Sequence, residues 1–167
     1  SHAAVISEAI TGLRLVTPPS DLAVNKPFTM EAQWEVPDSA RSGDSFELLL
    51  PHPSVQGFVS NFTLVDSLAG REIGECDVSA KQVRCTFTTD YIEDHEDVRG
   101  TLRFQVMANR AAEPGALLFG NGRGPVIKVP IPQGVAEGLG AGERPTKPST
   151  TGWVRVEGDG LMWVVYV

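Results

Sequence analysis

The chain has 167 residues and a net charge of −7, and this acidic balance argues against nucleic acid and anionic membrane surfaces as partners. Hydrophobic residues make up 41% and charged residues 21%, which predicts a folded domain with a substantial core rather than a disordered tail. No apolar run approaches the roughly 20 residues that a membrane-spanning helix needs, so we expect no membrane insertion.

Residues 1–9 are interpreted as a flexible lead-in, and the first predicted strand follows at Ile10–Val16. The clearest pattern in the chain comes next, over residues 28–36, where apolar and polar side chains alternate. That period of two predicts a strand with one buried face, and it places Trp34 in the core. Pro37 ends this strand because proline cannot donate a hydrogen bond to a ladder.

Shorter segments of the same kind follow at near-regular intervals, separated by turn residues. They are residues 46–50, 58–65, 71–76, 83–88, 100–108, 116–119, 126–129, 153–156 and 161–167. Residues 91–97 are acidic and polar, and we expect a loop or one helical turn there. About ten short strands without an amphipathic helix indicate an all-β protein, an immunoglobulin-like β-sandwich of two antiparallel sheets with Greek-key connections.

Composition separates the C-terminal part of the chain from this domain. Residues 10–133 form the expected immunoglobulin-like domain, whereas residues 134–152 are rich in Gly, Ala, Glu, Pro and Thr and predict a linker or a long surface loop. Residues 153–167 are expected to form a C-terminal hairpin or the start of a following domain. Because the last strand ends at full hydrophobic strength, we expect the native chain to continue and this strand to pair with a sheet edge.

The two cysteines, Cys76 and Cys85, flank a polar turn between two predicted strands. A hairpin would bring the two sulfurs close, and a disulfide would then imply an oxidising, extracytoplasmic setting. Two buried or half-exposed thiols are the alternative. The spacing does not fit a metal site, since no histidine or further cysteine lies nearby in sequence. We expect neither a metal nor a cofactor.

No recognisable catalytic arrangement is present in the sequence. His52 lies between two prolines and His95 in an acidic loop, so neither offers a relay with a serine or cysteine, and we expect no enzymatic activity. The carboxylates of residues 93–97 could hold a calcium ion, but their spacing lacks the fixed pattern of a calcium-binding loop. A solvated acidic loop is the favoured interpretation.

Three segments of the chain resemble one family of proteins. They are Trp34-Glu-Val-Pro37 with Gly43-Asp44, Phe46 and Leu50-Pro51; Thr86-Phe-Thr-Thr-Asp-Tyr-Ile-Glu93 with the strand that follows it up to Phe104; and residues 161–167. In this order and spacing they are similar to the immunoglobulin-like adhesion domains of Gram-positive surface proteins, the clumping-factor-type adhesins that bind fibrinogen or collagen. The cysteine hairpin is more similar to the yeast agglutinin-like adhesins.

The resemblance implies a secreted, cell-wall-anchored adhesin domain whose partners are an extracellular protein or peptide ligand and an adjacent immunoglobulin-like domain of the same chain. In the family, a peptide lies in a groove between two such domains, and a C-terminal strand then pairs along the acidic motif. Backbone hydrogen bonds give affinity in strand addition of this kind. Carried over by position, the ligand-binding latch trench would be lined by Thr86, Phe87, Thr88, Asp90, Tyr91 and Glu93.

Two other functions stay open at this point: a structural spacer of a surface protein or pilus that binds nothing, and a carbohydrate-binding β-sandwich module. A free edge beside residues 83–88 and exposed aromatic side chains near Tyr91 would favour adhesion, whereas a covered edge and a polar surface would favour the spacer. A carbohydrate-binding module would need a row of exposed aromatics. The alternative for residues 86–93 is a strand and a polar turn, with Phe87 in the core and Tyr91 packed at a sandwich corner.

Overall fold

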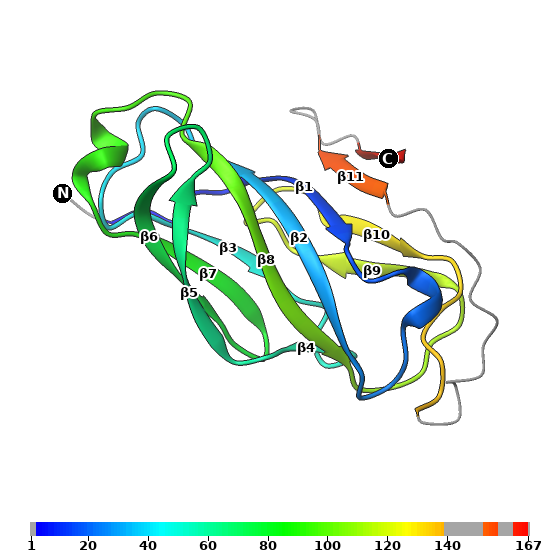
Figure 1. The fold of residues 1–167 in the computed structure, drawn as a ribbon. Coiled ribbons are helices and arrows are strands. Elements are labelled where there is room, and N and C mark those ends of the chain that lie inside the picture. The colour runs from blue at the N-terminus through cyan, green and yellow to red at the C-terminus, as the bar shows by residue number, and fades with distance from the viewer. Residues whose placement is uncertain (1–2, 139–151, 157–161, 167) are drawn as a thin grey trace.

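The computed structural model describes residues 3–138, 152–156 and 162–166, and the regular secondary structure in these ranges is almost entirely β-strand (Figure 1). The strands are β1 (Ile10–Leu15), β2 (Pro27–Glu35), β3 (Ser45–Leu49), β4 (Val55–Gly57), β5 (Ser60–Asp66), β6 (Arg71–Val78), β7 (Gln82–Phe87), β8 (Arg99–Ala108), β9 (Gly115–Phe119), β10 (Ile127–Ile131), β11 (Gly152–Val156) and β12 (Met162–Tyr166). Two short 3-10 helices, η1 (Pro19–Asp21) and η2 (Asp90–Glu93), lie between them. No helix in the described ranges is long and apolar enough to cross a membrane.

One layer of the fold is a six-stranded antiparallel sheet in the order β12-β11-β1-β2-β8-β4. Its longest pairing is between β2 and β8, which stay in register from Pro27 opposite Met107 to Glu35 opposite Arg99. Both strands alternate apolar and polar residues, so a single register buries the apolar face of each. The strands predicted over 28–36 and 100–108 are confirmed as β2 and β8 of this layer.

The other layer combines a four-stranded sheet, β3-β7-β6-β5, with the pair β10-β9. Leu49 at the end of β3 and Gly120 just after β9 exchange two backbone hydrogen bonds of 2.9 Å, which join the two pieces. Consecutive strands such as β2 and β3, and β7 and β8, belong to opposite layers. The predicted immunoglobulin-like β-sandwich is confirmed.

The core lies between the two layers and is centred on an aromatic cluster. Trp34 of β2 stacks on Phe46 of β3 with ring centroids 5.5 Å apart, and both rings contact Phe87 of β7 at 6.0 Å. Each of the three side chains is at most 2% exposed. Because burial of one aromatic side chain is worth several kcal/mol, this cluster is a main tie between the layers.

Strand β4 is not predicted by the sequence pattern. Its three residues, Val55–Gly57, pair with the C-terminal end of β8 and cover only that end of the strand. The strand expected over residues 58–65 begins later, as β5 at Ser60. Three residues are too few to show a period of two, so the pattern gave no signal for β4.

Residues 3–9, treated above as a flexible lead-in, are hydrogen-bonded to the second layer. The amide of Ser45 donates to the carbonyl of Ala4, and the amide of Ile6 donates back to the carbonyl of Ser45. The side chain of Asn121, which is 1% exposed, both accepts from the amide of Ile10 at 3.2 Å and donates to its carbonyl at 2.9 Å. The N-terminal segment thus fills part of the β3 edge.

The C-terminal residues that the structure describes extend the first layer. β11 pairs with β1, and β12 pairs with β11 along its full length. Most of the predicted linker, residues 139–151, and the middle of the predicted C-terminal hairpin, residues 157–161, lie outside the described ranges. At the start of the predicted linker, Val135 and Ala136 are hydrogen-bonded to Ala112 and to the Leu22–Val24 segment.

Candidate functional site

The segment expected to line a latch trench begins on β7, which has a partner on each side. β3 pairs with β7 from Ser45 opposite Thr86 to Leu49 opposite Gln82, and β6 pairs with its other edge. The amide of Phe87 donates to the carbonyl of Asp44, and its carbonyl accepts from Gly43. A foreign strand cannot add to β7 unless β3 or β6 leaves, so the free edge that would favour adhesion is not found beside residues 83–87.

The six residues of the expected trench differ in exposure: Phe87 is buried, Thr86 and Tyr91 are half-buried, and Thr88, Asp90 and Glu93 are exposed. Phe87 is in the core with 1% exposure, while Thr88 is exposed and its amide donates to the carbonyl of Ile73. Asp90 opens η2 and is exposed. Glu93 accepts from the amide of Ser42 at 3.2 Å and lies 3.5 Å from the guanidinium of Arg41. These side chains tie η2 to the β2–β3 connection.

Tyr91 is half-buried and is held on three sides. Its hydroxyl donates to Asp66, the last residue of β5, at 2.8 Å, and Asp66 is itself 3% exposed. His95 stacks on one face of its ring at 3.7 Å, and the guanidinium of Arg71 lies 5.5 Å from the ring centroid. The hydrogen bond to the Asp66 carboxylate raises the pKa of Tyr91 above its ordinary value. The phenol therefore stays protonated and fixes the end of β5.

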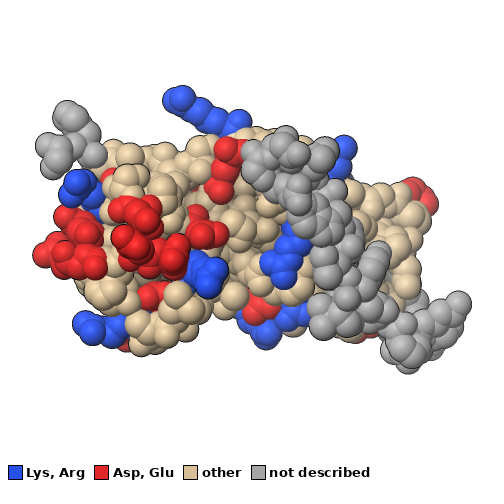
Figure 2. All heavy atoms as spheres, turned by 90° about the horizontal axis from the view of Figure 1, so that it is seen from above, with Lys and Arg blue, Asp and Glu red and all other residues tan. Residues whose placement is uncertain are grey.

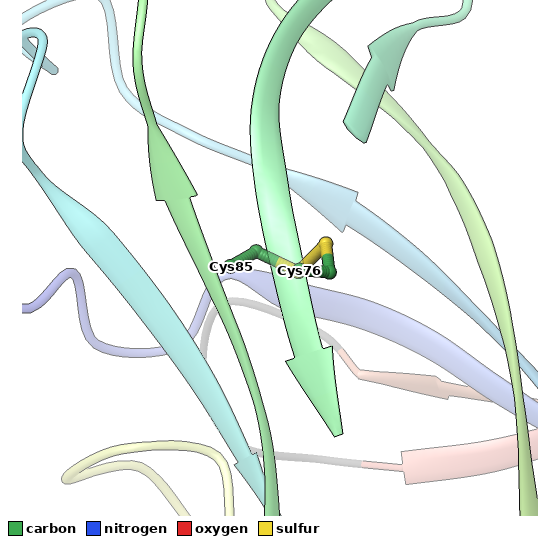
Figure 3. Close-up of a disulfide and its surroundings, with 2 residues drawn as sticks. All are labelled: Cys76 and Cys85. Atoms are coloured by element: carbon green, nitrogen blue, oxygen red, sulfur yellow. A yellow bond between two sulfur atoms is a disulfide. The ribbon is translucent and has the colours of Figure 1, made fainter. Parts of the chain in front are cut away.

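The two cysteines form a disulfide between adjacent strands (Figure 3). Cys76 on β6 lies directly opposite Cys85 on β7, and both side chains are fully buried in the core. Of the two alternatives weighed from the sequence, the bridge is the one that the structure contains. The disulfide thus links β6 and β7 covalently on the side of the second layer that faces the core.

An open backbone edge occurs on β8 instead of β7. At one end the amide of Phe58 donates to the carbonyl of Gln105, and at the other end the amide of Ser67 donates to the carbonyl of Arg99. Because hydrogen-bonding direction alternates along a strand, Thr101 and Arg103 point their N–H and C=O groups to this same side. No backbone partner for these groups is present in the described part of the chain.

A groove of about 570 Å³ lies beside this open edge. One wall is the segment that leads into β5, and the other is the outer face of β2 and β8; the lining residues are Thr29, Phe58, Val59, Ser60, Asn61, Phe62, Arg103, Phe104 and Gln105. Val59 is 83% exposed and Phe58 is 38% exposed. The groove therefore offers exposed apolar side chains next to unpaired backbone groups.

Gly100 allows β8 and β5 to lie close together at the Arg99 end of this open edge. A Cβ atom at Gly100 would lie 2.8 Å from the carbonyl oxygen of Val65 and 2.9 Å from the hydroxyl of Ser67. β8 and the end of β5 can approach this closely only because position 100 has no side chain. The open window on β8 runs from Arg99 to Gln105, a length of about 20 Å for an extended strand.

A charge network supports the outer face of the same sheet. Glu31 on β2 accepts from Arg14 on β1 at 2.8 Å and from Arg103 on β8 at 2.9 Å. Burial acts to raise the pKa of Glu31, but the hydrogen bonds from Arg103 and Arg14 outweigh it and bring the pKa below its ordinary value. The ionised carboxylate links three strands and orients Arg103 beside the groove.

Acidic side chains gather at the end of the molecule where η2 lies, as Figure 2 shows from above. The η2 region contributes Asp90, Glu93, Asp94, Glu96 and Asp97. Among the described residues, no three histidine, cysteine or carboxylate side chains come together as metal ligands. The acidic segment of the η2 region is mostly exposed, in keeping with the solvated loop favoured from the sequence.

The residues of the open edge were not singled out from the sequence. The alternation over residues 100–108 predicts β8 and its buried face, but it does not say which strands will lie beside it. The edge is open because β4 is only three residues long and covers β8 from Val106 to Ala108. The exposed pair Phe58-Val59 was assigned to a strand, although it lies between β4 and β5.

The fold is a small immunoglobulin-type domain of two β-layers. A family model described as a bacterial Ig domain matches residues 22–115. This is more than half of the chain, and the chain belongs to that family. A search of curated protein sequences finds no match.

Twelve chains among the solved structures match the fold. One is the collagen adhesin of S. aureus, with a TM-score of 0.60 and 17% sequence identity over 93% of this chain. The alignment spans 53% of the length of that adhesin chain. At this level of identity the likeness establishes the fold: this chain and that part of the adhesin share the immunoglobulin-like architecture.

Proposed function

We propose that this chain is a surface-displayed, adhesin-type domain that binds an extended segment of an extracellular protein by adding it as a strand to the open edge of β8. The bacterial Ig family and the likeness to an adhesin support the coarse part of this proposal. The unpaired backbone groups of Thr101 and Arg103 support the mode of binding. No catalytic step is involved.

The single observation that carries the proposal is the gap between two backbone contacts on β8. Ser67 closes one end at Arg99 and Phe58 closes the other at Gln105, which leaves an edge flanked by apolar side chains. An added strand would gain backbone hydrogen bonds from Thr101 and Arg103, and Phe58 and Val59 would receive its apolar side chains. The carboxylate of Glu31 accepts hydrogen bonds from Arg14 and Arg103, and so links β8 through β2 to β1 beside this edge.

The residues carried over from the family motif take a different part in this proposal. Phe87 is buried and Tyr91 holds Asp66 at the end of β5. We infer that Tyr91 positions the β5 side of the edge rather than contacting the ligand. Binding by Thr86, Thr88, Asp90 or Glu93 themselves stays a prediction.

The structural spacer is the second candidate, and a specific observation favours it. Both edges of β7 are covered, which is the arrangement expected of a spacer in this part of the fold. The carbohydrate-binding module has less support, because Phe58 is the sole aromatic residue among the exposed large hydrophobic side chains of the described residues. The open β8 edge is the reason to place adhesion first.

A matched pair of substitutions at Thr101 tests the proposal. Thr101→Pro removes the outward N–H, whereas the ladder to β2 is kept because Thr101 does not donate to it; Thr101→Val loses the same hydroxyl and keeps the N–H. The probes are immobilised collagen and immobilised fibrinogen, with the wild-type chain in solution. We expect the wild type to bind at least one of them, Thr101→Pro to bind about tenfold more weakly, and Thr101→Val to be unchanged.

Two results would count against strand addition at β8. Equal binding by wild type and Thr101→Pro would show that the edge is not used. Absence of binding to both probes would favour the spacer. Melting temperatures of all three proteins show that the comparison is made between folded chains.

A further inference from the structure

The outer edge of β1 has a surface that fits β11, and β11 pairs with it. We call this surface, formed by Gly12, Arg14 and Gln33, the seat. Gly12 lies opposite Arg155 and Leu13 lies opposite Val154 in an antiparallel pair. Leu13 and Val154 turn toward the core and are 0% and 2% exposed. The added strand therefore completes the core as well as the sheet.

On the other face of this pair, Trp153 lies over the one position of β1 that has no side chain. A Cβ atom at Gly12 would lie 3.3 Å from the indole of Trp153 and 3.0 Å from the side-chain oxygen of Gln33. The guanidinium groups of Arg14 and Arg155 lie 5.0 Å and 5.1 Å from the Trp153 ring. Cation–π contact of this kind is worth about 0.5–2 kcal/mol per pair. Trp153 is 9% exposed as a result.

The residues of the seat belong to β1 and β2, and β11 contributes none of them. Arg14 is held by Glu31 at 2.7 Å, and Glu31 is also bonded to Arg103, so the cation that receives the indole is fixed by β2 and β8. Gly12 and Gln33 belong to β1 and β2. Any strand that presents an aromatic side chain followed by an aliphatic one would meet the same surfaces.

The stability of the β11–β12 hairpin, by contrast, depends on pairing with the edge strand of a sheet. A two-stranded hairpin is at best marginally stable in water unless it packs against further structure. Each copy of the chain carries one β1 edge and one such hairpin, and the contacts described above are identical whether the two belong to one molecule or to two. We propose that the β1 edge is a strand-acceptor site that also takes the β11–β12 hairpin of a second copy of this chain, giving a strand-exchanged dimer in equilibrium with the monomer.

A disulfide trap across the register tests this proposal. Gly12→Cys combined with Arg155→Cys places two thiols on directly opposed residues of β1 and β11. The native cysteines are buried and bonded to each other, so they do not compete. After mild oxidation at about 1 to about 200 µM protein, the share of covalent dimer on a non-reducing gel should rise at least fivefold, because exchange between copies follows mass action. Peptide mass spectrometry identifies the 12–155 link in the dimer band.

The matched control is a pair inside the domain. Glu35 and Arg99 are opposed on β2 and β8 and are both exposed, so Glu35→Cys with Arg99→Cys should close within one chain at every concentration. The single variant Arg155→Cys measures random cross-linking. If the 12–155 pair also closes only within one chain over the whole range, the acceptor site is confined to its own hairpin and the proposal is overturned.

A mixing experiment gives an independent measurement. Arg14→Glu replaces the cation that receives the indole of Trp153 by an anion and blocks the acceptor, while Val154→Asp puts a charge in the core and blocks the donor. Each variant alone should be monomeric by native mass spectrometry, and the mixture should contain a 1:1 heterodimer with one exchanged hairpin. A mixture that stays monomeric contradicts exchange, and the disulfide trap decides the matter if either variant does not fold.

Discussion

Cys76 and Cys85 face each other across β6 and β7 with their Cα atoms 4.0 Å apart, and neither side chain is exposed. The bridge closes a loop with a sequence separation of 9 residues. We predict that Cys76→Ala with Cys85→Ala lowers the free energy of unfolding by about 2–3 kcal/mol through the entropy of the unfolded chain, with a further loss from the smaller core side chains.

Urea unfolding of the variant and of the wild type checks this prediction. The native, unreduced wild type should show no alkylated cysteine by intact mass. It should also resist reductant in native buffer until it unfolds, because the sulfurs are enclosed. Rapid reduction of the folded protein would contradict the buried position of the bridge.

Gly100 should not accept a side chain. Gly100→Ala would place a methyl group 2.8 Å from the carbonyl oxygen of Val65 and 3.0 Å from the ring of Trp34, so β8 and the end of β5 would have to separate. We expect a loss of about 1–3 kcal/mol in the free energy of unfolding. Gly115→Ala is the matched control, since the nearest atom to its Cβ would be 3.8 Å away, and it should be nearly neutral.

The hydrogen bond from Tyr91 to Asp66 should be measurable as stability. Tyr91→Phe keeps the ring contacts with His95 and Arg71 but leaves one oxygen of a buried carboxylate without its donor. We predict a loss of about 1–3 kcal/mol, read from denaturant midpoints at neutral pH. An unchanged midpoint would mean that water replaces the hydroxyl at no cost.

Glu31 should make stability depend on pH on the acid side. Its pKa is lowered in the folded protein, so its contribution is present above the pKa of the unfolded chain and is lost as the pH falls through the lower, folded value. Glu31→Gln should melt at a lower temperature than the wild type at neutral pH, and the difference should shrink in acid. Thermal melts between about pH 3 and pH 7 measure this, and a constant difference would contradict it.

The buried faces of the strands were predictable, while the neighbours of each strand were not. The alternation of residues 28–36 and 100–108 predicted β2 and β8 to within a residue or two, because a period of two depends only on the local chain. The cysteine spacing indicated a hairpin that would bring the two sulfurs close, and it left a disulfide and two thiols as alternatives; the structure contains the disulfide, with Cys76 opposite Cys85. Which strands lie at an edge depends on contacts between residues far apart in sequence.

This limit explains why the open edge lies on β8 and not beside the segment that resembles the family motif. Residues 86–93 resemble a family motif, yet β7 is closed on one side by β3, whose partner residues lie about forty positions earlier in the chain. The open edge arises on β8 because β4 stops at Gly57 and the chain then departs toward β5. Neither the pairing of β3 with β7 nor the end of β4 at Gly57 changes the local alternation of apolar and polar residues, so the sequence pattern predicts neither.

The short window on β8 also bears on how this protein behaves at high concentration. An exposed strand edge is a template for aggregation, and natural sheets guard such edges with charge and with brevity. In the part of the chain that the structure describes, only Thr101 and Arg103 lack a backbone partner between the two closed ends of this edge, and the charge of Arg103 is held in place by Glu31. Two unpaired residues beside a charged guanidinium group are a poor template for the repeated strand pairing of a fibril. The domain can therefore leave this edge uncovered in solution.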